Sequence, residues 1–248
     1  MSVIIECNSV WKKFGKPASG IKELLIGKKS GFSKYAREWA LQDVNFQVER
    51  GTSFGIVGHN GTGKSTLLSL LLGTILPDRG SISVKGRVSS LLELGAGFHP
   101  DLTGRENIFL YASISGMRLA DINKNLQSII DFSELESAID NPIRTYSSGM
   151  VARLGFSTII HLPVDILLID EVLAVGDSKF QDKCKRFLMD FKKNNGTLVI
   201  VSHEMETLLE MCDVGVCMNL GKVVQYGDIK SVVAQYKSIM KSSTQKAA

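Results

Sequence analysis

The sequence predicts an α/β fold, and three observations predict it. A glycine-rich stretch at residues 58–65 lies between a short apolar run and a helical run. Two later runs, at residues 163–171 and 197–203, are almost continuously apolar, which is typical of parallel strands covered on both faces. Segments of helical period alternate with such runs to about residue 224, and this alternation predicts a sheet covered by helices.

The glycine-rich stretch carries the pattern G-x-x-x-x-G-K-S in the setting strand, loop, helix. Its backbone N–H groups are expected to hold phosphate oxygens, aided by the positive end of the helix dipole. Lys64 is expected to reach the β- and γ-phosphates of a nucleotide, and Ser65 to hold Mg²⁺. The alternative is a glycine-rich turn with a chance lysine, which the flanking strand and helix disfavour. The expected nucleotide-binding residues are Gly58, His59, Asn60, Gly61, Thr62, Gly63, Lys64, Ser65 and Thr66.

The length of 248 residues suits one large α/β domain or two small ones. A hydrophobic content of 44% with 22% charged residues is typical of a soluble globular protein. The net charge of +4 does not by itself indicate a nucleic-acid partner. The four cysteines have no zinc spacing, so we expect buried or free thiols in a reducing cytoplasm. The N-terminus does not resemble a signal peptide, and apolar runs fall short of the ~18 residues of a membrane span.

The first part of the chain is expected to consist mainly of strands around the phosphate loop. In chain order we expect a strand at 3–10, a surface insertion at 15–38 with a short helix at 21–26, strands at 39–48 and 53–57, a helix at 66–72, a turn at 77–80, and strands at 81–84 and 88–92.

A glycine-rich connection at residues 93–100 then leads into a helical region. Thr103 and Glu106 form the pattern of a capping box that opens one helix. The later elements are expected to be a helix bearing Ile122, Leu126, Ile129 and Ile130, a helix from about 146, a strand at 163–171, a helix bearing Phe180, Cys184, Phe187, Leu188 and Phe191, a strand at 197–203, and a terminal helix at about 228–240 followed by a frayed end.

Two acids end the apolar run at residues 163–171. Asp170 is placed to hold Mg²⁺ directly or through water. Glu171 is placed to polarise the attacking water as general base. Paired acids at a strand end are also common as a helix N-cap signal, but the upstream Lys64 and Ser65 favour the catalytic interpretation.

Residues 146–150, Tyr-Ser-Ser-Gly-Met, open a further helix with small residues. Backbone amides and a Ser hydroxyl then face outward together, which makes an anion site at a helix start. The alternative is an ordinary N-cap with a glycine nearby. Gly149 lies 21 positions before Asp170 (170 − 149), and this order favours the functional interpretation.

Together these segments resemble the nucleotide-binding subunit of an ATP-binding cassette (ABC) transporter over nearly the whole chain. Residues 58–65 match the Walker A loop, residues 166–171 match Walker B with the catalytic glutamate, and residues 146–150 match the signature, usually Leu-Ser-Gly-Gly-Gln. The resemblance implies a P-loop NTPase (RecA-like) core with a mixed sheet and an inserted α-helical ABC subdomain. The implied boundaries are about 1–98 and 162–225 for the core, about 99–161 for the helical subdomain and about 228–241 for a C-terminal helix.

The resemblance also assigns roles in the signature, where Ser148 and Met150 replace the usual glycine and glutamine. Ser147, Ser148 and the amide of Gly149 are implied to bind the γ-phosphate of ATP held by a partner subunit. His203 matches the switch histidine, a γ-phosphate sensor, with a buried structural histidine as the alternative.

An aromatic ring that stacks on adenine is also implied. Phe14 falls at the family's position, and Trp39 is the competing candidate. Core packing is the alternative for either ring.

Two departures from the common pattern narrow the subfamily. Glu93 stands where most cassettes carry a glutamine that contacts Mg²⁺ and water. The loop after Walker B places Asp177 at the turn that faces the dimer partner. With the insertion before Trp39, these features resemble polysaccharide exporters, above all the ATPase of bacterial O-antigen export, with capsular and teichoic acid exporters as alternatives. At this length we expect a short form without a C-terminal carbohydrate-binding domain.

The resemblance implies a homodimer that holds two ATP and Mg²⁺, with Lys64 of one copy and Ser147 of the other at each ATP. Closure is expected to move the helical subdomain and pull on an integral membrane permease dimer. The substrate would be a lipid-linked polysaccharide, and the subunit would lie peripherally on the cytoplasmic face of the bacterial inner membrane. Residues 94–99 are the candidate contact with the permease or the lipid-linked sugar. Bulky residues at Gly95 and Gly97 are expected to uncouple export while sparing ATP hydrolysis.

Two other classes of protein are less compatible with the sequence. A non-transport ABC ATPase that acts on DNA or ribosomes would usually have long coiled coils or paired cassettes, so we expect no nucleic-acid partner. A nucleotide kinase would not need the signature, and residues 123–126 lack the Asp of a guanine-specificity box.

Overall fold

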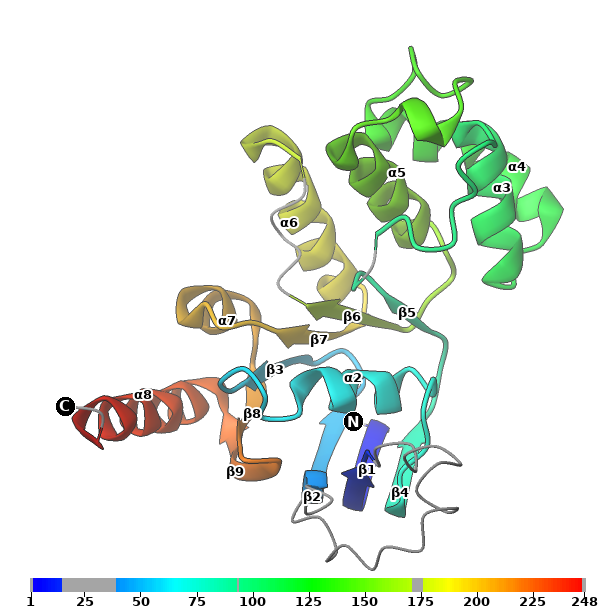
Figure 1. Ribbon diagram of the computed structural model, residues 1–248. Helices are drawn as coiled ribbons and strands as arrows, with labels where there is room; N and C mark the ends of the chain where they lie inside the picture. The colour runs from blue at the N-terminus through cyan, green and yellow to red at the C-terminus, as the bar shows by residue number, and fades with distance from the viewer. Residues whose placement is uncertain (1, 15–38, 93, 171–175, 247–248) are drawn as a thin grey trace, which may run out of the picture. The chain divides into compact units, whose positions relative to one another are not determined.

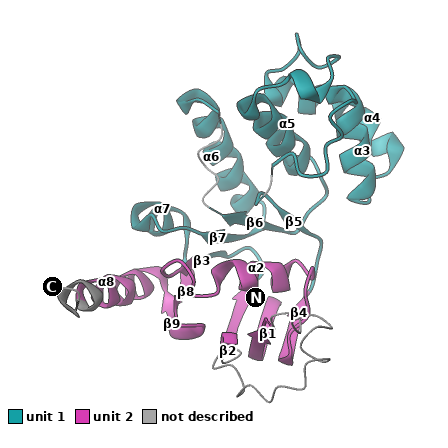
Figure 2. Ribbon diagram, in the orientation of Figure 1, with its two compact units in different colours: residues 1–2, 49–55, 85–213 teal, residues 3–48, 56–84, 214–248 magenta. Residues whose placement is uncertain are grey.

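The computed structural model describes residues 2–14, 39–92, 94–170 and 176–246, with side chains as far as residue 241 (Figure 1). The insertion predicted at residues 15–38 lies outside the described residues, as do Glu93 and Glu171. The chain divides into two compact units, which are treated separately below (Figure 2). Unit 1 comprises residues 1–2, 49–55 and 85–213, and unit 2 comprises residues 3–48, 56–84 and 214–248.

Unit 1 combines parallel strands with most of the helices. Its elements are β5 (Val88–Ser90), α3 (Gly104–Ile114), α4 (Leu119–Ser133), the 3₁₀ turn η1 (Ile143–Thr145), α5 (Ser148–Ile160), β6 (Ile166–Asp170), α6 (Ser178–Lys193), β7 (Thr197–Val201) and α7 (Met205–Met211). β6 lies between β5 and β7 and runs parallel to both, with Asp170 opposite Val201 (Figure 1). The first residues of β3 (Ser53–Val57) lie beside β7. The apolar runs of β6 and β7 are almost fully buried, as the sequence predicted for parallel strands.

The helices α3, α4 and α5 form a group with its own hydrophobic core (Figure 1). The predicted capping box opens α3, because the Thr103 side chain accepts from the Glu106 backbone and Glu106 reaches back to the Thr103 N–H. The core is lined by apolar residues of all three helices and the turns between them: Ile108, Ala112, Met117, Ile122, Ile129, Ile130, Leu135, Ile139, Ile143, Leu154 and Leu162. The boundaries of a helical subdomain at about 99–161 stay a prediction.

Unit 2 contains the phosphate loop and two sets of strands. Its elements are β1 (Val3–Lys13), β2 (Trp39–Glu49), the end of β3, α2 (Lys64–Leu71), β4 (Arg79–Val84), β8 (Val214–Asn219), β9 (Lys222–Asp228) and α8 (Ile229–Lys246). β1 lies between β2 and β4 in a three-stranded sheet and pairs antiparallel with β4. β8 follows β3 in strand order and pairs antiparallel with β9, so parallel and antiparallel pairs both occur, as predicted.

Several element boundaries differ from those predicted; for example, β1 continues to Lys13 instead of ending at residue 10, and β6 begins at Ile166 instead of residue 163. The turn expected at residues 77–80 is shorter than predicted, because β4 already begins at Arg79, which pairs with Trp11 of β1. The strand expected at residues 88–92 ends at Ser90. The terminal helix continues to Lys246 instead of fraying from residue 241, since residues 241–246 contain no Gly or Pro that would end it.

The four cysteines are buried and free, as expected. Burial raises the pKa of Cys7 and Cys212 to about 12, so these thiols stay protonated at neutral pH. Among the residues that the structure describes, no helix combines the length and the apolar character needed to cross a bilayer.

Candidate nucleotide-binding site

The phosphate loop of unit 2 joins the fully buried β3 to α2. Gly63 caps α2 with a φ of 99°, a conformation that side chains other than glycine rarely adopt. A Cβ on Gly58 would lie 2.5 Å from the Met218 carbonyl oxygen and 2.7 Å from the Thr62 hydroxyl. Both glycines are therefore required by backbone geometry and close packing, and the predicted strand, loop and helix are all present.

Lys64 is the first residue of α2, and its side chain folds back over the loop. Its Nζ donates to the carbonyl oxygens of Gly58 at 2.6 Å and His59 at 3.0 Å, and the residue is 9% exposed. The Thr62 hydroxyl donates to the same His59 carbonyl at 2.8 Å. A buried ammonium group held in this way provides the positive charge that a phosphate group requires. Ser65, the expected Mg²⁺ ligand, is exposed in the first turn of α2.

The terminal helix contacts this loop, which the sequence did not predict. The His59 ring lies edge-on to the Tyr236 ring of α8, with centroids 5.7 Å apart. The sequence predicted only the terminal helix that carries Tyr236. A contact between residues 177 positions apart (236 − 59) leaves no local pattern in the sequence.

The two candidate adenine-stacking rings differ in exposure. Phe14 directly follows β1 and is 55% exposed, with Lys12 over its ring at 5.8 Å. Trp39 packs edge-on against Trp11 at 5.1 Å and carries Lys13 over its ring at 5.1 Å. The geometry favours Phe14, because the Trp39 ring already has protein partners, and the role itself stays a prediction.

In unit 1, Asp170 and His203 lie at the ends of adjacent parallel strands. Asp170 is the last residue of β6 and pairs in register with Val201, the last residue of β7. His203 follows two residues later and is exposed. The turn that contains His203 is held by a hydrogen bond from the Glu204 N–H to the Ser202 hydroxyl at 2.9 Å. Since the carboxyl ends of neighbouring parallel strands meet at one sheet edge, Asp170 and His203 reach the same edge.

The signature segment forms the start of α5. Ser147 is the N-cap, and its hydroxyl accepts from the Met150 N–H at 3.3 Å. Ser148 is exposed, and a Cβ on Gly149 would meet only the Ser147 hydroxyl, at 3.9 Å. The fold of this chain therefore does not require glycine at position 149. Met150 and Tyr146 pack against the core of the helical group, which explains an apolar residue at position 150 in place of the usual glutamine.

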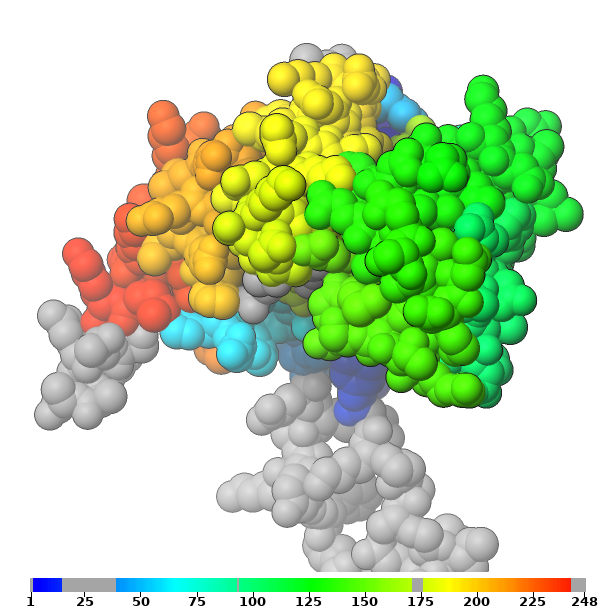
Figure 3. Space-filling model, turned by 90° about the horizontal axis from the view of Figure 1, so that it is seen from above, coloured from blue at the N-terminus to red at the C-terminus, as the bar shows by residue number. Residues whose placement is uncertain are grey.

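An ion pair joins this helix to the start of α6. Arg153 of α5 donates to Asp177 at 2.7 Å, and its guanidinium lies 4.9 Å from the centre of the Phe180 ring. Asp177 also caps α6 by accepting from the Phe180 N–H at 2.9 Å, and this bond, aided by Arg153, lowers its pKa. In Figure 3 the green surface up to about residue 160 and the yellow surface of α6 share one face of unit 1. The sequence predicted Asp177 at the turn after Walker B but did not predict its contact with Arg153.

The glycine-rich connection packs against α5 and α3. A Cβ on Gly95 would collide with the Val151 side chain of α5. At its far end the connection is held by Asn107, a fully buried residue of α3 that the sequence did not single out. The Asn107 amide donates to the carbonyl oxygens of His99 at 3.0 Å and Thr103 at 2.9 Å, and its oxygen accepts from the His99 N–H at 2.6 Å.

The residues of the phosphate loop fit a nucleoside triphosphate. The phosphate loop offers backbone N–H groups, a buried ammonium group and two glycine positions that a Cβ would fill. Ser65 of unit 2 and Asp170 of unit 1 each carry an oxygen atom of the hard type that Mg²⁺ prefers. Within the described residues, no three His, Cys, Asp or Glu side chains cluster as a metal site.

Lys64→Ala is expected to weaken ATP binding by about 100-fold, because removing a charge-assisted contact in a buried site costs about 2–3 kcal/mol. Equilibrium titration with ATP measures the effect. Lys230→Ala, which removes an exposed lysine of α8 in the same unit, should leave the affinity unchanged. Equal affinity in Lys64→Ala and the unaltered protein would contradict the assigned role.

Comparisons with known proteins agree with this geometry. The model of the family described as ABC transporter matches residues 41–174. The "O-antigen export system ATP-binding protein RfbB" of Klebsiella pneumoniae is 46% identical over 224 residues, which cover 90% of this chain and 91% of that protein. The "Teichoic acids export ATP-binding protein TagH" of Bacillus cereus is 36% identical over 235 residues, which cover 95% of this chain and 42% of that protein.

A solved structure supports the same fold. It is titled "Dimeric structure of a post-hydrolysis state of the ATP-binding cassette MJ0796 bound to ADP and Pi". It superposes with a TM-score of 0.72 at 18% identity, and the match covers 91% of this chain and 98% of that chain.

Proposed function

Because the chain belongs to the ABC transporter family, we propose that it is the ATPase subunit that powers export of lipid-linked O-antigen polysaccharide. The observation that carries this proposal is the 46% identity to an O-antigen export ATP-binding protein over 90% of the chain. The teichoic acid exporter is the second candidate, and its identity of 36% makes it the less favoured one.

In this proposal two copies form a homodimer around two ATP molecules. Lys64 and the loop amides of one copy hold the β- and γ-phosphates. Ser147 and the Gly149 amide of the other copy reach the same γ-phosphate. The open space around Gly149 supports this role. Packing within the chain does not require a glycine at this position, but the close approach of a phosphate group from the partner copy would. The dimeric state of the solved ATP-binding cassette is consistent with the arrangement.

Hydrolysis in this proposal requires a base, a metal and a sensor. Glu171 removes the proton of the attacking water, and His203 contacts the γ-phosphate. Ser65, Asp170 and Glu93 are the residues that would hold Mg²⁺, and the ion would neutralise charge on the phosphates. Arg153 and Asp177 transmit changes between the signature helix and the turn before α6, because their ion pair joins both segments.

The membrane partner in this proposal is an integral permease dimer, and the subunit lies peripherally on the cytoplasmic face of the bacterial inner membrane. Co-expression with a candidate O-antigen permease, followed by isolation of the complex, tests the assignment. We expect both subunits to be isolated together and to restore O-antigen on cells that lack the ATPase. Isolation with ribosomes or DNA instead of the permease would overturn it.

Residues 94–99 are the proposed contact with the permease or its substrate. The structure changes the test expected from the sequence, because a bulky residue at Gly95 would push on α5 and so would disturb the signature as well. Ala96 is exposed in the same segment and is the better position.

Ala96→Trp is expected to reduce export about tenfold, as a bulky residue does at the centre of an interface, while ATP hydrolysis by the isolated subunit stays within about twofold. Export assays in cells and phosphate release by the purified subunit measure the two effects. Ser128→Trp, on an exposed face of α4, is the matched control. Normal export by Ala96→Trp would remove this contact from the proposal.

A further inference from the structure

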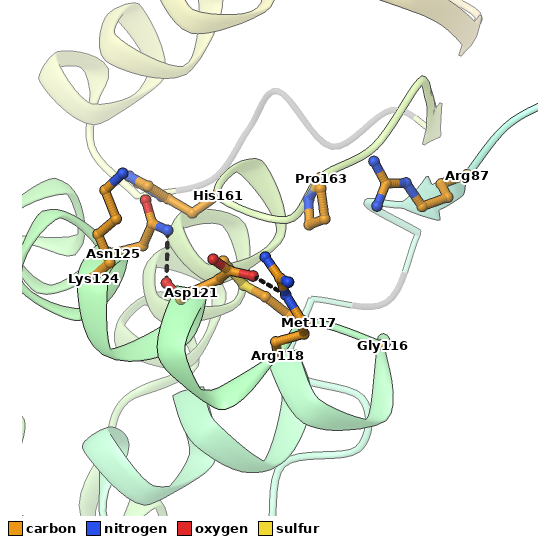
Figure 4. Close-up of a pocket in the computed structure, with 9 residues that line it drawn as sticks. All are labelled: Arg87, Gly116, Met117, Arg118, Asp121, Lys124, Asn125, His161 and Pro163. Carbon is orange, nitrogen blue, oxygen red and sulfur yellow. Dashed lines mark hydrogen bonds and ion pairs between the residues drawn. The ribbon is translucent and has the colours of Figure 1, made fainter.

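A pocket of about 510 Å³ opens in unit 1, at the end of α5 that is opposite the signature. His161, the C-cap of α5, lines it together with residues of α4 and Arg87, which directly precedes β5 (Figure 4). Ser147 caps the other end of the same helix. The pocket volume falls in the range of about 300–1,000 Å³ that small-molecule sites occupy.

The charged residues of the pocket are mostly basic. Arg87, Arg118 and Lys124 face one carboxylate, Asp121, which leaves a formal charge of +2 (3 − 1). Asp121 accepts from Arg118 at 2.8 Å, and the Arg118 side chain is 84% exposed. Figure 4 places Lys124 at one side of the pocket and Arg87 at the other, with the Arg118–Asp121 pair between them.

The cations at the two sides have no acidic side chain of the pocket as partner. In the part of the chain that the structure describes, Lys124 forms no ion pair with an acidic side chain. Near Arg87, the Asp165 carboxylate accepts from the Arg87 backbone N–H at 2.8 Å and from the Arg50 guanidinium at 3.0 Å, and these bonds together with the Arg50 and Arg87 charges lower its pKa. An anion in the pocket would therefore gain most from Lys124 and would share Arg87 with Asp165.

Two other groups in the pocket are hydrogen-bond acceptors. The His161 Nδ1 lies 2.7 Å from the Ser157 carbonyl oxygen, so Nδ1 carries the proton and donates it. Burial lowers the pKa of His161, so the ring is neutral at pH 7 and Nε2 is an acceptor. The Asn125 Nδ2 donates to the Asp121 carbonyl oxygen at 2.7 Å, which leaves Oδ1 as an acceptor beside Lys124.

We propose that this pocket binds a phosphorylated polyol, a molecule that carries a phosphate group together with free hydroxyl groups. The phosphate pairs with Arg118 and with Lys124 or Arg87. Two hydroxyl groups donate to His161 Nε2 and Asn125 Oδ1, whereas inorganic phosphate as HPO₄²⁻ has a single O–H for both acceptors. A free sugar phosphate and the phosphoglycerol headgroup of a lipid share this chemistry.

Isothermal titration with glucose 1-phosphate tests the free ligand, on the full chain with the phosphate loop saturated by ADP and Mg²⁺. We expect Arg118→Gln/Lys124→Gln to weaken binding at least about tenfold, as loss of charge-assisted hydrogen bonds does. Lys179→Gln/Lys185→Gln, which removes two exposed lysines of α6 in the same unit, should bind as the unaltered protein does. Thermal unfolding by circular dichroism verifies that each variant is folded.

Two further measurements distinguish a lipid headgroup from a free sugar phosphate and test the role of the hydroxyl groups. Co-sedimentation with phosphatidylglycerol vesicles, against phosphatidylcholine vesicles, tests the lipid headgroup with the same variants. His161→Phe should reduce the preference for glucose 1-phosphate over inorganic phosphate, because only Asn125 Oδ1 then remains as an acceptor, and should affect the binding of inorganic phosphate less. The proposal is supported if the unaltered protein and the α6 variant bind one of the two ligands and the pocket variant does not. The ligand that is bound then identifies the source of the phosphate group. Absence of binding to both ligands, or equal binding by both double variants, would overturn it.

Discussion

Glu171→Gln is expected to lower ATP turnover by ~10²–10⁴-fold, the usual effect of losing a general base. The amide matches the carboxylate in shape but does not accept the proton of the attacking water. ATP affinity should stay the same, because Lys64 and the loop amides are untouched. Steady-state phosphate release and equilibrium ATP titration measure the two quantities.

The matched control for this variant is Glu206→Gln, which makes the same change at an exposed position in the first turn of α7. It should hydrolyse ATP at the normal rate. Turnover by Glu171→Gln equal to that of the control would transfer the role of base to another group.

Gly149→Asp is expected to reduce ATP hydrolysis at least about 10²-fold, because a carboxylate beside the γ-phosphate opposes the electrostatic stabilisation that the preorganised donors provide there. The added carboxylate would occupy the open space above the first turn of α5 and repel the γ-phosphate of the partner copy's ATP. Binding of ATP to the phosphate loop of the same copy should be unaffected. Asn123→Asp adds the same charge on an exposed part of α4 and should have no effect on either quantity.

Gly149→Ala separates this effect from folding. The added Cβ meets no atom of this chain closer than 3.9 Å, and alanine in a helix is favoured over glycine by up to about 1 kcal/mol. The thermal midpoint should therefore stay the same or rise while hydrolysis falls. A lower midpoint together with lower activity would instead indicate a structural role for Gly149.

The sequence predicted the parts of the site that short segments encode. The loop at Gly58 and Gly63, the capping box at Thr103 and the strand that ends at Asp170 are each determined by residues close together in the chain. Buried parallel strands were predictable for the same reason, because continuous apolar runs have few other uses in a soluble domain. The structure confirms the strands, the loop and the helices that carry these residues.

Contacts between distant segments could not be predicted in this way. The pairs His59–Tyr236 and Arg153–Asp177 join side chains from different elements, and neither pair has a characteristic spacing. Asn107 lies in a helix among apolar residues, and only the fold shows that its amide holds a turn through three carbonyl oxygens. The pairing of β1 with β4 likewise depends on two strands separated by the phosphate loop and its helix.

The central claim is that two copies of this chain bind ATP jointly, and sedimentation equilibrium of Glu171→Gln with Mg-ATP tests it most directly. The account predicts a species of twice the 27.1 kDa chain mass with ATP, and a single chain without ATP or when Gly149→Asp is added. A single chain that has bound ATP, or a dimer that Gly149→Asp leaves intact, would contradict the account.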